Sequence, residues 1–101
     1  MKALRINPEQ QTIDEVDISG LDGIVQLIGF DTVISDDIGP DGDRLYFDED
    51  CFLRGSSGRF QIDTVVPVAG TGVVVGMAAD GEQLQDASSD LEGLRKRLKY
   101  L

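Results

Sequence analysis

The stretch TVVPVAGTGVVVGMA, Thr64–Ala78, is the most apolar part of the chain and marks where its core must lie. Three consecutive β-branched residues, Val73–Val75, are typical of a strand that is buried on both faces. The glycines of GTG at 70–72 predict a bulge or a sharp bend where the chain enters this strand. A dinucleotide-binding loop is disfavoured, because the spacing is G-x-G-x-x-x-G and no helix pattern follows to hold a pyrophosphate.

The segment before this stretch contains strand and helix signals. KALRIN at 2–7 alternates between apolar and polar residues, PEQQ at 8–11 is a turn, and TIDEVDI at 12–18 is expected to be the hairpin partner. Apolar residues at helical spacing over 21–28 then predict a short helix. We expect Ser19 to cap the start of this helix and Gly29 to end it.

A second hairpin is predicted in the middle of the chain. FDTVIS at 30–35 and RLYFD at 44–48 read as strands, and the Pro-Asp-Gly sequence at 40–42 favours a turn between them. Most of the acidic stretch SDDIGPDGDRLYFDEDC at 35–51 is therefore interpreted as a solvated hairpin tip with exposed strand faces. On this interpretation the acidic strip is dispensable for folding, and Asp41→Asn/Asp43→Asn should melt at or above the parent temperature.

The same acidic stretch also has a partial calcium-loop pattern. The candidate ligands are Asp37, Asp41, Asp43 and Asp48, with Asp37 at the first position of the loop. Gly39 stands where a ligand belongs, the twelfth residue is Asp rather than the usual bidentate Glu, and strands rather than helices are expected to flank the loop. A weak divalent-cation site thus remains an alternative to the solvated hairpin.

The last part of the chain is expected to be an amphipathic helix over residues 87–101. Ser89 and Glu92 fit a capping box, and basic residues follow toward the helix end, as the helix dipole favours. The apolar stripe of this helix consists of Leu91, Leu94, Leu98 and Leu101. A helix this short must pack on something, so the stripe is expected either to dock on the protein's own sheet or to bind a partner, including a second copy of the chain.

These elements predict one α+β domain over residues 1–101, with a mostly antiparallel sheet, one short internal helix, a C-terminal helix and a core within about 1–82. The chain carries 19 acidic and 9 basic side chains, a net charge of −10, so direct nucleic-acid and anionic-membrane binding are disfavoured. There is no secretory signal pattern and no apolar run long enough for a membrane helix. The single cysteine excludes an intramolecular disulfide. Together with the lack of a signal pattern and of a membrane-length apolar run, it favours a cytoplasmic location.

The residue inventory disfavours most catalytic chemistry. The chain has no histidine, so a Ser-His-Asp triad is impossible and the usual zinc sites are excluded. Cys51 has no histidine to activate it and is expected to be a small core residue. RGSSGR at 54–59 could form a small anion cradle, but a flexible loop is the simpler interpretation. We therefore predict a protein that is not an enzyme and that holds no cofactor.

Three segments of the chain resemble a small family of uncharacterised domains common on phages and plasmids. They are MKALRINPEQQTIDEVDI at 1–18, RLYFDEDCFLRG at 44–55 and VAGTGVVVG at 68–76, and the resemblance covers roughly residues 1–82. The chain departs from that family at DEDCFLRG, at Gly-Thr-Gly and in its basic C-terminal segment. The resemblance implies a mobile-element accessory protein and assigns no functional residue.

Three functions follow as expectations. The first is a non-catalytic interaction module, with an unidentified protein partner and a possible homodimer through the leucine stripe. The second is an acidic DNA mimic that inhibits a DNA-binding defence protein, because residues 31–50 hold eight acidic side chains against Arg44, a net −7. The third is the weak divalent-cation site in the same region.

Overall fold

A computed structural model describes residues 1–39, 41–55, 58–81 and 83–101 of the chain. Its elements are β1 (Lys2–Asn7), β2 (Thr12–Asp17), α1 (Leu21–Ile28), β3 (Val33–Asp37), β4 (Asp43–Asp48), the 3-10 turn η1 (Cys51–Leu53), β5 (Arg59–Ile62), β6 (Val68–Ala69), β7 (Gly72–Met77), β8 (Leu84–Gln85), α2 (Leu91–Arg97) and β9 (Leu98–Tyr100). Every strand pairing is antiparallel. The expected α+β class is confirmed.

The valine strand β7 lies in the middle of a six-stranded sheet. The strand order is β2-β1-β7-β4-β3, and the short β8 pairs with the end of β7. Val74 lies between Leu4 of β1 and Leu45 of β4, and all three side chains are fully buried. The prediction of a strand covered on both faces is therefore confirmed.

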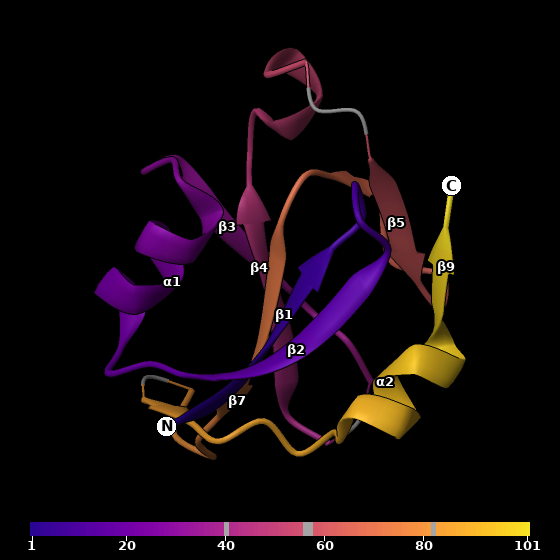
Figure 1. The fold of residues 1–101 in the computed structure, drawn as a ribbon. Coiled ribbons are helices and arrows are strands. Elements are labelled where there is room, and N and C mark those ends of the chain that lie inside the picture. The colour runs from indigo at the N-terminus through magenta and orange to yellow at the C-terminus, as the bar shows by residue number, and fades with distance from the viewer. Residues whose placement is uncertain (40, 56–57, 82) are drawn as a thin grey trace.

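The two faces of β7 contact different layers, which lie on opposite sides of the large sheet (Figure 1). Val73 and Val75 pack with Ile24 and Ile28 of α1. The opposite face packs against a three-stranded sheet of order β6-β5-β9 and against α2, and its buried residues include Leu4, Leu45, Phe60, Ile62, Val68, Val74 and Leu94. The protein thus has two apolar clusters with the large sheet between them.

Helix α1 is flanked by glycines, Gly20 before its first residue and Gly29 after its last. Gly29 adopts the left-handed conformation at φ 88° and donates its N–H to Val25 O at 2.8 Å, which confirms it as the helix stop. The expected Ser19 cap is wrong, because Gly20 precedes the first helical residue and no side chain caps the helix. Gly23 lies against Ile18, where a Cβ would be 3.0 Å from the Ile18 Cβ. Packing on the sheet therefore stabilises a helix of poor intrinsic propensity.

A sharp bend carries the chain from the small sheet into the large one. Gly70, between β6 and β7, has φ 75° and donates its N–H to Gly58 O at 3.0 Å. Gly72 begins β7 so close to β5 that a Cβ there would lie 2.5 Å from Phe60 Cζ. The predicted bend at the Gly-Thr-Gly sequence is confirmed, and its reason is the close approach of the two sheets.

The C-terminal segment differs from the expected helix over 87–101. The helix covers only Leu91–Arg97, and the chain then extends into β9, where Leu98 pairs with Ile62 of β5. Its N-cap is Asp90, whose carboxylate accepts the Gly93 N–H at 2.6 Å, so the expected Ser89 capping box is wrong. Leu94 is fully buried, and the core therefore extends beyond the expected limit near residue 82.

Candidate functional site

Two of the aspartates in the acidic stretch are buried, contrary to the solvated-hairpin interpretation. Asp43 is 1% exposed and Asp48 is 3% exposed. The Asp43 carboxylate accepts hydrogen bonds from the N–H groups of Ser88 and Ser89, at 2.7 and 2.9 Å, and from the Ser89 hydroxyl at 2.7 Å. Asp43 therefore ties β4 to the segment that leads into α2, and the expectation that it is an exposed tip residue is wrong. Asp41 is exposed, as expected.

The four candidate calcium ligands do not come together. Asp43 and Asp48 lie at opposite ends of β4, and Asp37 pairs with Arg44 at 2.6 Å. The strands β3 and β4 flank the turn, as expected from the sequence. Within the part of the chain that the structure describes, no group of three or more His, Cys, Asp or Glu side chains is placed to hold a metal ion.

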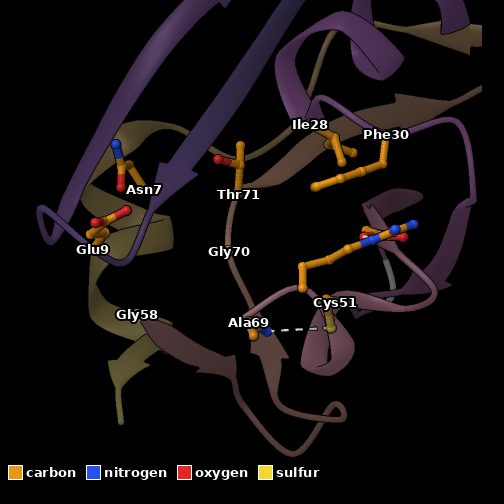
Figure 2. A pocket seen from close by; sticks show the side chains of 11 residues that line it. Asn7, Glu9, Ile28, Phe30, Cys51, Gly58, Ala69, Gly70 and Thr71 are labelled. Carbon is orange, nitrogen blue, oxygen red and sulfur yellow. Dashed lines mark hydrogen bonds and ion pairs between the residues drawn. The ribbon is translucent and has the colours of Figure 1, made fainter. Parts of the chain in front are cut away.

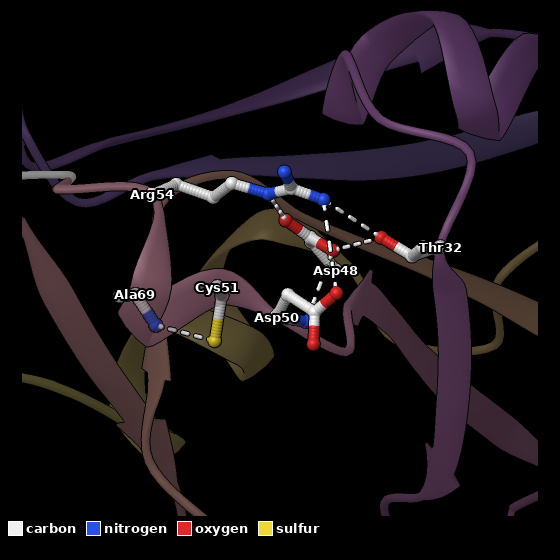
Figure 3. A network of polar contacts seen from close by, with 6 residues as sticks. All are labelled: Thr32, Asp48, Asp50, Cys51, Arg54 and Ala69. Atoms are coloured by element: carbon white, nitrogen blue, oxygen red, sulfur yellow. Dashed lines mark hydrogen bonds and ion pairs between the residues drawn. The ribbon is translucent and has the colours of Figure 1, made fainter.

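Asp48 organises the end of β4. Its carboxylate accepts the Arg54 Nε–H at 2.9 Å, the Asp50 N–H at 3.1 Å and the Thr32 hydroxyl (Figure 3). Arg54 Nη2 also donates to Thr32 Oγ1 at 3.1 Å and lies 3.9 Å from an Asp50 carboxylate oxygen. A buried carboxylate that accepts hydrogen bonds from several donors is itself fixed, and it therefore holds the guanidinium in one orientation.

The electrostatics of this ion pair favour the charged forms. Burial by itself raises the pKa of Asp48, but hydrogen bonds from Arg54, Thr32 and the Asp50 N–H outweigh it and lower that pKa below the ordinary value. The hydrogen bond to Asp48 raises the pKa of Arg54 in return. Both groups are therefore charged at neutral pH.

The Arg54 guanidinium also covers an aromatic ring. Its Cζ lies 4.1 Å from the centre of the Phe30 ring. The turn η1, which precedes Arg54, projects Phe52 and Leu53 into solvent, with exposures of 52% and 83%. Arg59 Cζ lies 5.3 Å from the Phe52 ring. The side chains of Phe30, Phe52, Leu53, Arg54 and Arg59 are called the η1 surface below.

Cys51 anchors η1 from beneath. The thiol is buried, as expected for a small core residue, and its Sγ accepts the Ala69 N–H of β6 at 3.5 Å (Figure 3). A hydrogen bond from Leu53 N–H to Asp50 O at 2.8 Å closes the turn. The exposed apolar side chains thus stand on a turn that is fixed at both ends.

A pocket of about 120 Å³ lies beside this surface (Figure 2). Its wall includes Phe30 on one side and Asn7 and Glu9, from β1 and the following turn, on the other (Figure 2), and Arg54 also lines it. The remaining lining residues are Ile28, Asp48, Cys51, Gly58, Ala69, Gly70 and Thr71. Its polar groups are a carboxamide, carboxylates, a hydroxyl and one guanidinium, so it can hold a small side chain but has no cationic cluster for a phosphate.

The leucine stripe is largely used by the protein itself. Leu94 is fully buried, and Leu91 and Leu98 pack against the core between the sheets. Leu101 is 57% exposed. Leu91, Leu94 and Leu98 therefore dock on the protein's own core, which was one of the two expected alternatives. Self-association stays a prediction.

The acidic strip offers fewer free carboxylates than its sequence suggests. Asp43 and Asp48 are buried in hydrogen-bond networks, and Asp37 and Asp50 have arginine partners. This reduces the exposed charge on which the DNA-mimic hypothesis depends.

The sequence did not identify the η1 surface. DEDCFLRG shows an apolar pair between charged residues, but Phe30 and Arg59 join that pair only through tertiary contacts. The loop expected as an anion cradle is described only in part, because residues 56 and 57 lie outside the described residues, and its Arg54 is committed to Asp48. The turn residue Pro40 also lies outside them.

No helix in the described ranges combines the length and apolar character needed to cross a membrane. No protein-family model, no curated protein and no solved structure matches the chain. The geometry of the η1 surface and its pocket is therefore the basis for the function proposed next.

Proposed function

We propose that this protein is a non-catalytic protein-interaction module that binds its partner through the η1 surface and the adjoining pocket. The observation that supports this most directly is the Arg54 side chain, held by buried Asp48 and stacked on Phe30, beside the exposed Phe52 and Leu53. Aromatic residues and arginine dominate interface hot spots. A side chain that is already fixed loses little conformational entropy when a partner binds.

The chemistry of the surface favours binding over catalysis. Its apolar groups are exposed on a chain of net charge −10, where most other surface positions are polar. Arg54 uses Nε and Nη2 within the protein, whereas Nη1 makes no hydrogen bond to the described residues. A partner can therefore supply an acceptor to Nη1 and an apolar side chain to the pocket. The mobile-element origin implied by the resemblance remains a prediction.

Site-specific photo-crosslinking tests this proposal. A benzophenone amino acid at position 53 should form a discrete covalent adduct with a protein partner in the cells that produce this chain. The same probe at position 21, where Leu21 is another exposed apolar residue at 53% exposure, is the matched control. Arg54→Ala should abolish the adduct at position 53. Equal labelling from both positions, or an adduct that survives Arg54→Ala, would exclude the η1 surface as the binding site.

A further inference from the structure

The strand β9 forms one edge of the small sheet, and Figure 1 shows it at the margin of the molecule beside β5. Two backbone hydrogen bonds fix its register: Asp63 N–H to Arg97 O at 3.0 Å and Leu101 N–H to Arg59 O at 2.9 Å. In an antiparallel ladder, hydrogen-bonded pairs alternate with non-hydrogen-bonded pairs. The pair between these two bonds, Lys99 with Gln61, is therefore also of the hydrogen-bonded kind.

It follows that the backbone groups of Leu98 and Tyr100 point away from β5. Among the described residues no strand pairs with that side of β9, so neither of these two N–H groups has a partner in the sheet. Their side chains pack against the core and are half-buried, so both retain surface at the sheet edge. Lys99 lies between them in the strand and its side chain is on the opposite, solvent-facing side.

The charge of this edge differs from that of the remaining surface. The side chains of residues 91–101 comprise four bases and one acid, a net charge of +3. The total net charge is −10, so residues 1–90 have a net charge of −13. Arg95 and Arg97 pair with acidic groups of the protein. Lys96 and Lys99 are exposed and have no ion-pair partner within the described part of the chain.

We propose that the outer edge of β9 binds an extended acidic segment of a partner protein, which adds a fourth strand to the small sheet. Such strand addition supplies main-chain hydrogen bonds for affinity and side-chain positions for specificity. The register predicts an apolar–acidic–apolar pattern in the partner. The apolar residues lie beside Leu98 and Tyr100 on the core side, and the acidic residue lies beside Lys99 on the solvent side.

A second copy of the chain fits this edge less well. Two β9 strands paired antiparallel about a two-fold axis, with Leu98 opposite Tyr100, would place Lys99 directly opposite Lys99 of the partner. Like charges at directly opposed positions destabilise a strand pair. The unpaired lysines therefore select an acidic strand and disfavour self-pairing.

The test is an NMR titration of the full chain with the blocked peptide Thr-Val-Glu-Val-Glu-Val-Thr. Amide hydrogen exchange of Leu98 and Tyr100 should slow as the peptide is added, while the exchange of Lys99, already bonded to β5, should change less. The same peptide with lysine in place of glutamate should leave all three unchanged. Binding should weaken as salt is raised, because the lysines are exposed.

Matched variants separate this edge from other sites. Lys96→Glu/Lys99→Glu should weaken peptide binding by on the order of tenfold, whereas Lys2→Glu, in β1 of the large sheet, and Leu53→Ser, in the η1 surface, should bind as the parent does. Unchanged exchange at saturating peptide would overturn the proposal. A second result would also overturn it. If the amides of Leu98 and Tyr100 became more protected from exchange as the concentration of the protein alone was raised, and sedimentation showed a dimer, a second copy would occupy the edge.

Discussion

The substitution Asp43→Asn tests whether a buried carboxylate joins the C-terminal segment to the sheet. In the parent, one Asp43 oxygen accepts the Ser88 N–H at 2.7 Å, and the other accepts the Ser89 N–H and hydroxyl at 2.9 and 2.7 Å. An asparagine amide has one acceptor oxygen, so its NH₂ group must face one of the two backbone N–H groups. That donor then loses its partner in a part-buried site, which costs up to about 1–3 kcal/mol.

The loss of charge adds to this cost. Hydrogen bonds to a charged group contribute more than neutral ones, and removing the buried negative charge offsets part of that loss because its desolvation cost is also removed. We expect the free energy of unfolding to fall by about 2–4 kcal/mol. For a domain of this size that corresponds to a melting temperature lower by about 10–25 °C.

Urea and thermal unfolding, followed by circular dichroism, measure this change. Asp41→Asn is the matched control, because Asp41 is exposed two residues away, and its effect should stay within about 0.5 kcal/mol. A melting temperature for Asp43→Asn equal to that of Asp41→Asn would refute the structural role of Asp43. In that case the Ser88–Ser89 turn holds without the carboxylate.

Three further predictions concern the core and the η1 site. Val74→Asp places an unpaired charge between Leu4 and Leu45, and no folded soluble protein should be recovered at neutral pH; a normal melt would place β7 at the surface. The parent should lose stability below about pH 4, because the lowered pKa of folded Asp48 stabilises the fold above the pKa of the unfolded carboxyl and this stabilisation is lost as the pH falls through the folded pKa. Asp48→Asn should lose less stability over the same pH range, and an acid titration like that of the parent would contradict this. Gly58→Ala should destabilise by about 1–3 kcal/mol in a urea melt, since its Cβ would lie 2.3 Å from Glu9 N, and an unchanged midpoint would show that the turn can move.

Local patterns in the sequence determined the regular elements near the valine strand. Consecutive β-branched residues at 73–75, alternation at 2–7 and glycine at 29 each specify a backbone conformation through short-range sterics and through the period of apolar residues. Those predictions needed only the identity of neighbouring residues. The α+β class followed from them.

Tertiary structure alone decided which aspartates are buried and where the last helix ends. Asp43 and Asp41 are both acidic residues next to a turn, and they differ only because residues 88–89 fold back onto Asp43 from 45 positions away. Recruitment of the Ser89 hydroxyl by Asp43 leaves the capping role to Asp90. The leucine spacing over 91–101 is compatible with a helix, but β5 presents an unpaired edge whose main-chain groups must be satisfied, and Leu98 enters the sheet there. These outcomes depend on contacts between distant segments, which local propensity and the spacing of apolar residues do not reveal.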